Sequence, residues 1–293
     1  LGDVYKRQHA ENGEILNFLR SECVKKGQLT PHYHYVSRPP FTEAEAVRRA
    51  IYLAGQTDTP LYIAHMTCRE AIAELQKAKG TGQRVSGETC THYLTTTKEV
   101  LDNPDFNEAA KFVCSPALRD REDCEALWQA LSDGLLTAVS SDHCGIDVAE
   151  LKQAGRNDFT QIPNGSPGAG DRLHMVWTEG VCTGKLTRQK FVDVIATQPA
   201  KINGIYPRKG TLAVGSDADV VIFDPNYEGT VHLADNPNGV DYNLYEGRRQ
   251  SGRVETVLLR GQVVVENAKF VGRYGQGKFI PANMYASGYE NRN

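Results

Sequence analysis

The sequence predicts an α/β fold in which part of a (β/α)8 TIM-like barrel is followed by a small β-sandwich segment. Over about two hundred residues, short apolar runs that suit buried parallel strands alternate with stretches of helical spacing. Near Pro207 the pattern changes to Val-rich, Gly-punctuated strands. Two of the earlier apolar runs end on His65 and Asp142, and the end of a strand is where a barrel of this kind places its functional groups.

The first eight residues do not fit the barrel pattern. Leu1–Gln8 is mixed and polar, lacks the alternation of a strand, and has no initiator Met. We interpret residues 1–8 as a non-native scar and leave them out of the fold. The partial barrel is then expected to occupy residues 9–207 and to begin at His9.

The elements of the partial barrel follow from apolar spacing and from helix-start signals. Thr42 opens the capping-box pattern Thr-Glu-Ala-Glu ahead of a helix over residues 44–54. Only four strands end at catalytic positions, where a closed barrel has eight, so half of the barrel is expected to be missing. The other expected helices are 14–26, 69–79, 121–132, 171–183 and 187–197, and the expected strands are 61–64, 84–89, 111–115 and 135–140.

The chain after residue 207 is expected to form two further parts. Residues 211–223 and 254–265 have the composition of strands, and we assign them to a β-sandwich segment over residues 208–271. Residues 272–293 are rich in Gly, Tyr and Asn and are expected to form an extended C-terminal tail.

The composition fits a soluble globular enzyme and argues against several kinds of partner. Of the 293 residues, 40% are apolar and 24% are charged. The net charge of −3 provides no basic field for nucleic acid or anionic lipid. The seven scattered cysteines form no CxxC pair, which favours reduced thiols, and no apolar run is long enough to span a membrane. We therefore expect a cytoplasmic protein.

Three residues suit a hydrolytic metal centre: His9, His65 and Asp142. Imidazole nitrogens and a carboxylate are donors that zinc prefers, and three protein ligands can hold one ion with an open position. A lone histidine at a strand end is more often structural, and Asp142 could instead cap a helix. Their joint occurrence at strand ends favours the metal interpretation.

Eight segments in order along the chain resemble the cyclic amidohydrolases of the dihydropyrimidinase and D-hydantoinase family. The resemblance runs from His9 to about Ala282. The segments are HAENGE, SRPP, HMTCREA, GETCTHYL, FVCSPALRD, SSDHCGID, IPNGSPGAGDRL and YPRKGTLAVGSDADVVIFDP.

The resemblance implies a fold and a set of residue roles. It implies the C-terminal half of a (β/α)8 barrel plus a β-sandwich segment, and two divalent metal ions, zinc above all, bridged by a carboxylated lysine. His9 and His65 match ligands of the second metal, and Asp142 matches a ligand of the first metal that also acts as general acid and base. Ser115 and Asn164 match positions whose main-chain groups hold a cyclic ureide.

The resemblance also implies an activity, which is hydrolysis of dihydropyrimidines or 5-substituted hydantoins to N-carbamoyl amino acids by a homo-oligomer, a tetramer or a dimer. The family's first-strand HxH pair and its bridging lysine would precede His9 and are absent from this chain. We therefore expect an N-terminally truncated chain that is inactive alone.

Two alternatives belong to other functional classes. An allantoinase or dihydroorotase is a related cyclic amidohydrolase, but the IPNG and YPRKGT segments favour the hydantoinase branch. A non-enzymatic scaffold relative would be expected to have lost metal ligands, whereas His9, His65 and Asp142 are all retained.

Several other polar residues receive a structural interpretation. His32 and His34 form an HxH pair by letter, yet no apolar strand leads into them, so both are expected in a loop and neither on a metal. For the rest, we expect His143 and Cys144 either to face the side opposite Asp142 or to shape the pocket. We expect Glu88, Cys90 and His92 to pack at a strand end, and Asp171 and Arg172 to form an ion pair at a helix start.

Overall fold

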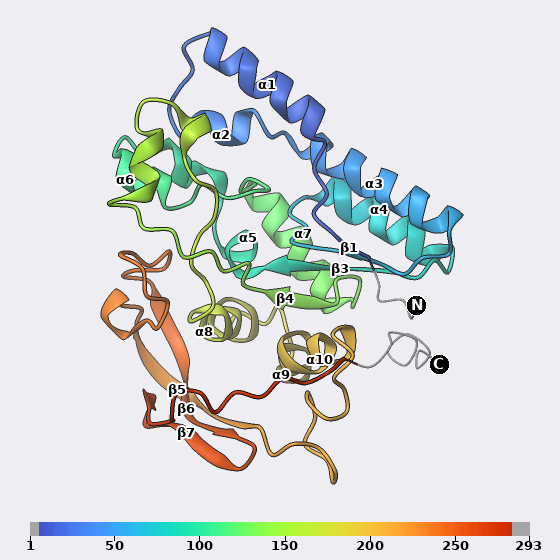
Figure 1. Ribbon diagram of the computed structural model, residues 1–293, viewed down its shortest axis with the longest axis vertical. Coiled ribbons are helices and arrows are strands. Elements are labelled where there is room, and N and C mark those ends of the chain that lie inside the picture. Colours follow the sequence, from blue (N-terminus) through green and yellow to red (C-terminus); the bar gives the residue numbers. More distant parts are fainter. Residues whose placement is uncertain (1–5, 283–293) are drawn as a thin grey trace. The chain divides into compact units, whose positions relative to one another are not determined.

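The computed structural model describes residues 6–282, which form two compact units (Figure 1). The parallel-sheet unit comprises residues 6–172 and 231–247. The antiparallel-sheet unit comprises residues 173–230 and 248–282. We predicted from the sequence that the barrel domain ends at residue 207, whereas residue 207 lies inside the antiparallel-sheet unit.

Four parallel strands form the sheet of the first unit. They are β1 (Lys6–Gln8), β2 (Leu61–Ile63), β3 (Val85–Cys90) and β4 (Ala138–Ser140), and they pair in the order of the sequence. Every neighbouring pair is parallel. Sequential parallel strands joined by helices are the arrangement of a (β/α) barrel, so the predicted fold class is confirmed.

Strand β1 corrects the exclusion of residues 1–8 from the fold. Lys6 N donates to Pro60 O over 2.9 Å and Ala64 N donates to Gln8 O over 3.0 Å, which joins β1 to the neighbouring segment. β1 has β2 as its neighbour and lies at the end of the sheet order, so its polar side chains reach solvent. The polar character of residues 6–8 was therefore no reason to exclude them from the sheet. Residues 1–5 lie outside the described part, and the proposed foreign origin of the segment stays a prediction.

The long helices follow the predicted spacing closely. They are α1 (Gly13–Lys25), α3 (Pro40–Gln56), α4 (Arg69–Gly80) and α7 (Arg121–Ser132). Asn12 caps α1, because its side-chain oxygen accepts from Ile15 N over 3.1 Å.

The predicted cap of α3 is wrong. Thr42 lies inside the first turn of the helix, and its hydroxyl donates to Pro39 O over 2.8 Å. The helix instead starts at Pro40, where the fixed φ of proline suits the first helical position.

The remaining helical elements are short. In the first unit they are α2 (His32–Val36), α5 (Thr91–Thr95), η1 (Lys98–Asp102), α6 (Phe106–Ala110), η2 (Leu151–Gly155), η3 (Phe159–Gln161) and η6 (Leu233–Asp235). Further along the chain the two predicted helices are divided into α8 (Arg172–Val176), η4 (Trp177–Val181), α9 (Arg188–Val192) and η5 (Asp193–Thr197). A further helix, α10 (Gln198–Ile202), follows the second predicted helix. No helix in residues 6–282 has both the length and the apolar character needed to cross a bilayer.

The strand expected over residues 111–115 is not formed. The carbonyl oxygens of Ala110 and Val113 accept hydrogen bonds from the ammonium group of Lys152, over 2.8 and 3.3 Å. Because these backbone acceptors are satisfied by a side chain, the segment has no need of a neighbouring strand.

The core of the parallel-sheet unit lies between the sheet and its helices. Tyr62, Ile63 and Val139 on the strands, Leu75 on α4 and Leu127 on α7 are all at most 2% exposed. Burying each such side chain contributes about 1.5–3 kcal/mol. Helices α3 and α4 lie side by side along the sheet (Figure 1).

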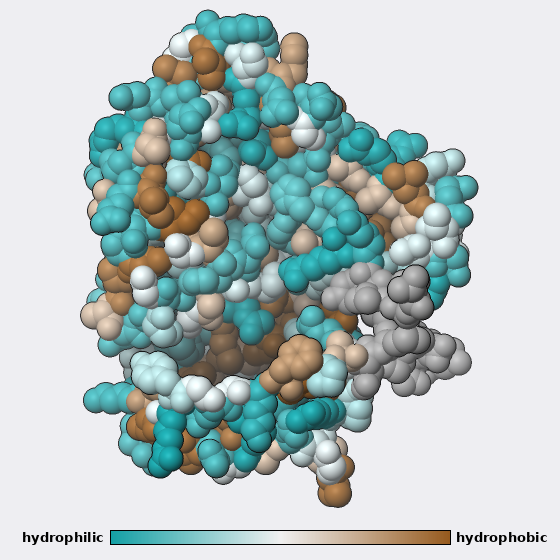
Figure 2. Space-filling model, viewed as in Figure 1, coloured by the Kyte–Doolittle hydropathy of each residue, from teal (hydrophilic) through white to brown (hydrophobic). Residues whose placement is uncertain are grey.

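The face seen in Figure 2 is mostly hydrophilic, with hydrophobic patches between the hydrophilic residues. Some of the apolar side chains in contact with solvent come from the outer helices. Phe18 on α1 is 63% exposed, and Tyr52 and Leu53 on α3 are 65% and 58% exposed.

The second unit contains one antiparallel sheet within its described residues. Its strands are β5 (Val220–Thr230), β6 (Arg249–Leu259), β7 (Gln262–Glu266) and β8 (Lys269–Phe270), in sequence order. β5 begins later than the strand expected from residue 211. Of the predicted tail, residues 272–282 contain no helix or strand, and residues 283–293 lie outside the described part.

Candidate functional site

Two of the predicted site residues meet at the ends of neighbouring strands. His9 follows β1 and His65 follows β2, and these strands are parallel and paired. His9 Nδ1 lies 2.9 Å from His65 Nε2, with the ring centroids 4.7 Å apart in an edge-to-face arrangement. The fold therefore brings together two imidazoles that are 56 positions apart in the sequence.

The imidazole of His65 is held in its neutral form. The pKa of His65 is lowered to about 4, mainly by burial and also by the nearby His9, while the negative charge of Asp142 opposes both effects. Its Nδ1 atom is buried and has no hydrogen-bond partner in the described structure. A neutral imidazole, which has a lone pair on one of its two ring nitrogens, is the form that binds a metal ion.

Asp142 follows β4 and remains outside the histidine pair. Strand β3 separates β2 from β4, which puts their axes roughly 10 Å apart at ordinary strand spacing. The Asp142 side chain is exposed to solvent. Within residues 6–282, no three His, Cys, Asp or Glu side chains are close enough together to hold one metal ion.

His65 and Asp142 share an unusual backbone conformation. Their φ angles are +37° and +43°, in the left-handed region that residues with a side chain rarely adopt. Such conformations cost about 1–3 kcal/mol and cluster at functional sites. The strand ends that carry the predicted ligands are therefore held in strained geometry.

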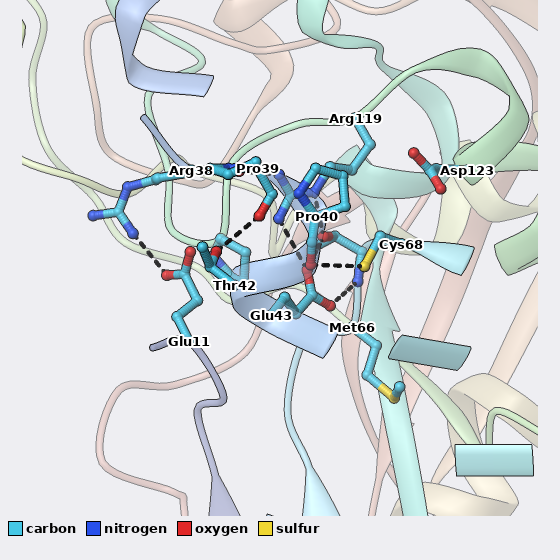
Figure 3. A network of polar contacts seen from close by, with 12 residues as sticks. Glu11, Arg38, Pro39, Pro40, Thr42, Glu43, Met66, Cys68, Arg119 and Asp123 are labelled. Atoms are coloured by element: carbon cyan, nitrogen blue, oxygen red, sulfur yellow. Dashed lines mark hydrogen bonds and ion pairs between the residues drawn. The ribbon is translucent and has the colours of Figure 1, made fainter. Parts of the chain in front are cut away.

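A buried carboxylate contacts His9. Glu11 Oε2 lies 3.1 Å from His9 Nε2. The same oxygen accepts from Arg38 Nη1 over 2.7 Å (Figure 3). Burial raises the pKa of Glu11, but the hydrogen bond with His9 and the charge of Arg38 outweigh it and lower the pKa overall. Neither Glu11 nor Arg38 was predicted from the sequence as a site residue, although HAENGE places a carboxylate two positions after the histidine.

A second buried ion pair lies behind the end of β2. Arg119 Nη2 and Glu43 Oε2 are 3.1 Å apart, and both side chains are at most 4% exposed. Glu43 Oε1 accepts from the backbone N–H of Thr67 over 2.7 Å, and Arg119 Nε donates to the Thr67 hydroxyl over 2.9 Å. A further Arg119 nitrogen donates to the carbonyl oxygen of Arg38. Thr67 follows His65 by two positions, so the Arg119–Glu43 ion pair fixes the chain beside His65.

The two predicted substrate-contacting residues are also brought together. The Ser115 hydroxyl donates to Asn164 Oδ1 over 2.7 Å, and Gly165 N donates to Val113 O over 3.0 Å. Lys152 links the segment of Ser115 to the segment of Asn164, because its ammonium group donates to Val113 O and, over 2.8 Å, to Gly165 O. This lysine is fully buried, and burial lowers its pKa to about 8. Nothing in its local sequence pointed to this role.

The HxH pair was wrongly expected in a loop. His32 and His34 lie in α2, which is too short to show helical periodicity in the sequence. His34 is buried, its Nε2 is 2.7 Å from Cys114 O, and burial lowers its pKa to about 3. His32 Nδ1 contacts Asp102 over 2.6 Å. The rings of His32 and His34 thus each have a polar partner. The expectation that neither histidine binds a metal ion stays a prediction.

The other polar residues have mainly structural contacts. Glu88 on β3 lies 2.6 Å from Arg7 and accepts from the Tyr62 hydroxyl over 2.8 Å. The predicted helix-start ion pair is replaced by other partners, because Asp171 accepts from Asn236, Asn238 and Asn243, whereas Arg172 donates to Val139 O over 2.9 Å. Cys90 and His92 are buried, His143 Nδ1 accepts from Gly168 N over 3.3 Å, and Cys144 is exposed.

Comparisons with known proteins agree with this arrangement. The sequence pattern of the amidohydrolase family matches residues 19–264. A D-hydantoinase of Ralstonia pickettii is 47% identical over 277 residues, which cover 94% of this chain and 60% of that enzyme. A dihydropyrimidinase of Arabidopsis thaliana is 39% identical over 272 residues, covering 93% of this chain and 51% of that enzyme.

Solved structures share the fold. The crystal structure of dihydropyrimidinase from Brevibacillus agri matches with a TM-score of 0.94 and 43% identity, covering 96% of this chain and 60% of that one. The chain thus spans 60% of the length of the first curated relatives it matches.

Proposed function

The chain belongs to the amidohydrolase family, and we propose that it carries part of the active site of a hydrolase that opens cyclic ureides. The proposed reaction converts dihydropyrimidines or 5-substituted hydantoins to N-carbamoyl amino acids. The observation that carries the proposal is the convergence of His9 Nδ1 and His65 Nε2 at the ends of neighbouring parallel strands, over 2.9 Å. The names of the relatives, D-hydantoinase and dihydropyrimidinase, support the substrate class.

The residues present fit a divalent metal ion. The 2.9 Å between the two imidazole nitrogens is close to the roughly 3.3 Å expected for two nitrogens on one tetrahedral zinc. We propose that His9 and His65 hold one ion and that Asp142 contributes to a second, with zinc favoured by nitrogen and carboxylate donors. Bound ions would supply an acidified water molecule and a polarised ring carbonyl.

The chain's own residues account for the remaining tasks. Asp142 would accept the proton of the attacking water and deliver it to the leaving ring nitrogen, which its exposed position after β4 allows. Main-chain groups at Ser115 and Asn164 would hold the fixed NH–CO–NH pattern of the ureide. The hydrogen bond between those two side chains and the Lys152 contacts behind them support a single rigid recognition surface.

The proposal includes the setting in which the enzyme works. We propose a cytoplasmic protein, which its unpaired cysteines support, and a homo-oligomer of two or four subunits. Neither nucleic acid nor a membrane is a proposed partner, because the net charge is only −3.

The test is hydrolysis by a chimera in which this chain replaces the matching 60% of the Ralstonia pickettii enzyme. With zinc added, the chimera should open dihydrouracil and 5-substituted hydantoins. A preference for dihydroorotate or allantoin would favour another cyclic amidohydrolase. A folded, metal-loaded chimera without any ureide hydrolysis would contradict the proposed activity.

A further inference from the structure

We propose that Glu11 is a positioning residue that fixes the tautomer of His9 and so selects the nitrogen that this histidine presents to a metal ion. The Glu11 side chain is only 2% exposed, and its Oε2 atom lies 3.1 Å from His9 Nε2. Arg38 Nη1 donates to the same oxygen over 2.7 Å, with its own side chain 11% exposed. This inference rests on the proposed function, because it concerns the use of His9 as a ligand.

The chemistry of the contact determines where the proton lies. An ionised carboxylate can only accept hydrogen bonds, so the neutral His9 ring must carry its proton on Nε2 to bond with Glu11. The lone pair of His9 is then on Nδ1, which is the atom that faces His65 Nε2. Without a metal ion, His65 Nε2–H can donate to that lone pair. With a metal ion, His9 Nδ1 is already in the form that binds it.

Arg38 fixes the place of the Glu11 carboxylate. Its guanidinium group contacts Glu11, while its carbonyl oxygen accepts from Arg119. Arg119 in turn contacts Glu43 (Figure 3). Arg119 also donates to the hydroxyl of Thr67, which lies two positions after His65. A continuous series of contacts through Glu11, Arg38 and Arg119 therefore connects the ring of His9 to the chain beside His65. Outer partners of this kind orient ligands, and their loss typically weakens metal binding 10–100-fold.

Asp123 provides a matched control. Like Glu11, it has a side chain only 2% exposed and accepts from an arginine, here Arg69 Nε over 3.1 Å. No contact drawn in Figure 3 joins it to the network around Glu11. Asp123→Ala thus removes an equally buried, arginine-paired carboxylate without touching either histidine.

The first measurement is made on the metal-free chain. Long-range 1H–15N spectra of imidazole-labelled protein at about pH 8.5, where histidines are ordinarily neutral, report the tautomer of each ring. His9 should carry its proton on Nε2 in the wild type and in Asp123→Ala, and should become a mixture of tautomers in Glu11→Ala. Glu11→Gln should restore the Nε2–H form, because its amide oxygen still accepts.

The second measurement is zinc affinity by calorimetric titration, with thermal unfolding followed in parallel. Glu11→Ala should weaken zinc binding about 10–100-fold, and Glu11→Gln should weaken it less. Asp123→Ala should bind zinc with wild-type affinity even if its unfolding temperature is lower. Wild-type tautomer and affinity in Glu11→Ala would overturn the inference, as would equal effects of Asp123→Ala. Failure of the wild type to bind zinc would count against the proposed metal centre instead, while the metal-free spectra still decide the role of Glu11.

Discussion

Strained residues at the strand ends link the fold to the proposed chemistry. His65 and Asp142 both have positive φ angles and lie two residues after the ends of strands β2 and β4, whose residues are mostly buried. The backbone turns sharply there, and the parallel pairing of the strands holds that turn against its conformational cost. A residue placed in this way has few alternative positions, which is what a ligand or a proton-transfer group requires.

Because different roles are proposed for Asp142 and His65, substituting each should produce a different defect. In the active chimera, Asp142→Asn should lower kcat about 10²–10⁴-fold, because asparagine keeps an oxygen for a metal ion but cannot accept a proton. His65→Ala removes a ligand, so its defect should appear first as lost metal. Metal content and kcat measured on the same preparations distinguish the two. Near-normal kcat with full metal in Asp142→Asn would show that Asp142 is not the proton acceptor.

The buried ammonium group of Lys152 predicts a pH-dependent stability. Its folded-state pKa of about 8 lies below the ordinary value of about 10.4. Between these values the unfolded chain binds more protons, so stability rises with pH. The two pKa values correspond to a rise of about 3 kcal/mol in the free energy of unfolding. This rise is complete above about pH 10.4 and is lost as the pH falls through 8. Urea unfolding from pH 7 to 10.5 should show this rise relative to Lys152→Met, and parallel curves for the two proteins would contradict it.

At the scale of elements, the sequence predicted long helices well and short or side-chain-supported segments poorly. The bounds of α7 match the prediction, because twelve residues contain enough apolar repeats to define its buried face. β1 has three polar residues, and backbone pairing with β2 decides its form. The segment 111–115 was expected as a strand because nothing local shows that Lys152 donates to the carbonyl oxygen of Val113 within it and to that of Ala110 just before it.

The segment that carries Asn164 depends on a glycine. Gly165 has a φ of +134°, and a Cβ atom there would lie 2.6 Å from Cys144 Cβ and 2.7 Å from Cys144 Sγ. Gly165→Ala should therefore destabilise the fold by about 1–3 kcal/mol and raise KM for ureides in the chimera. The matched control is Gly82→Ala, where φ is +79° and no neighbouring atom lies within 4 Å. Equal losses in urea unfolding for the two variants would exclude the close contact as a cause.

At the scale of the whole molecule, part of the candidate site was visible in the sequence and part was not. His65 stood out because it ends an apolar run and His9 because it opens the HAENGE segment, and the structure brings the two histidines together. The residues that support them come from distant positions, as when Arg119 reaches Thr67 and Glu43 across 52 and 76 positions. Such contacts leave no local spacing to detect, so only the folded chain reveals them.

The distribution of ligands over the chain leads to a last prediction, that this 293-residue chain alone hydrolyses ureides at close to the uncatalysed rate. His9, His65 and Asp142 supply three donors, whereas two metal ions with an open position between them need more. The described residues also place Asp142 away from the histidine pair, with no group of three suited to one ion. The measurement compares turnover of dihydrouracil and hydantoin by the zinc-supplemented chain and by the chimera. We expect zinc to bind the chain weakly through the histidine pair without producing turnover, and rates near those of the chimera would show that these three ligands suffice.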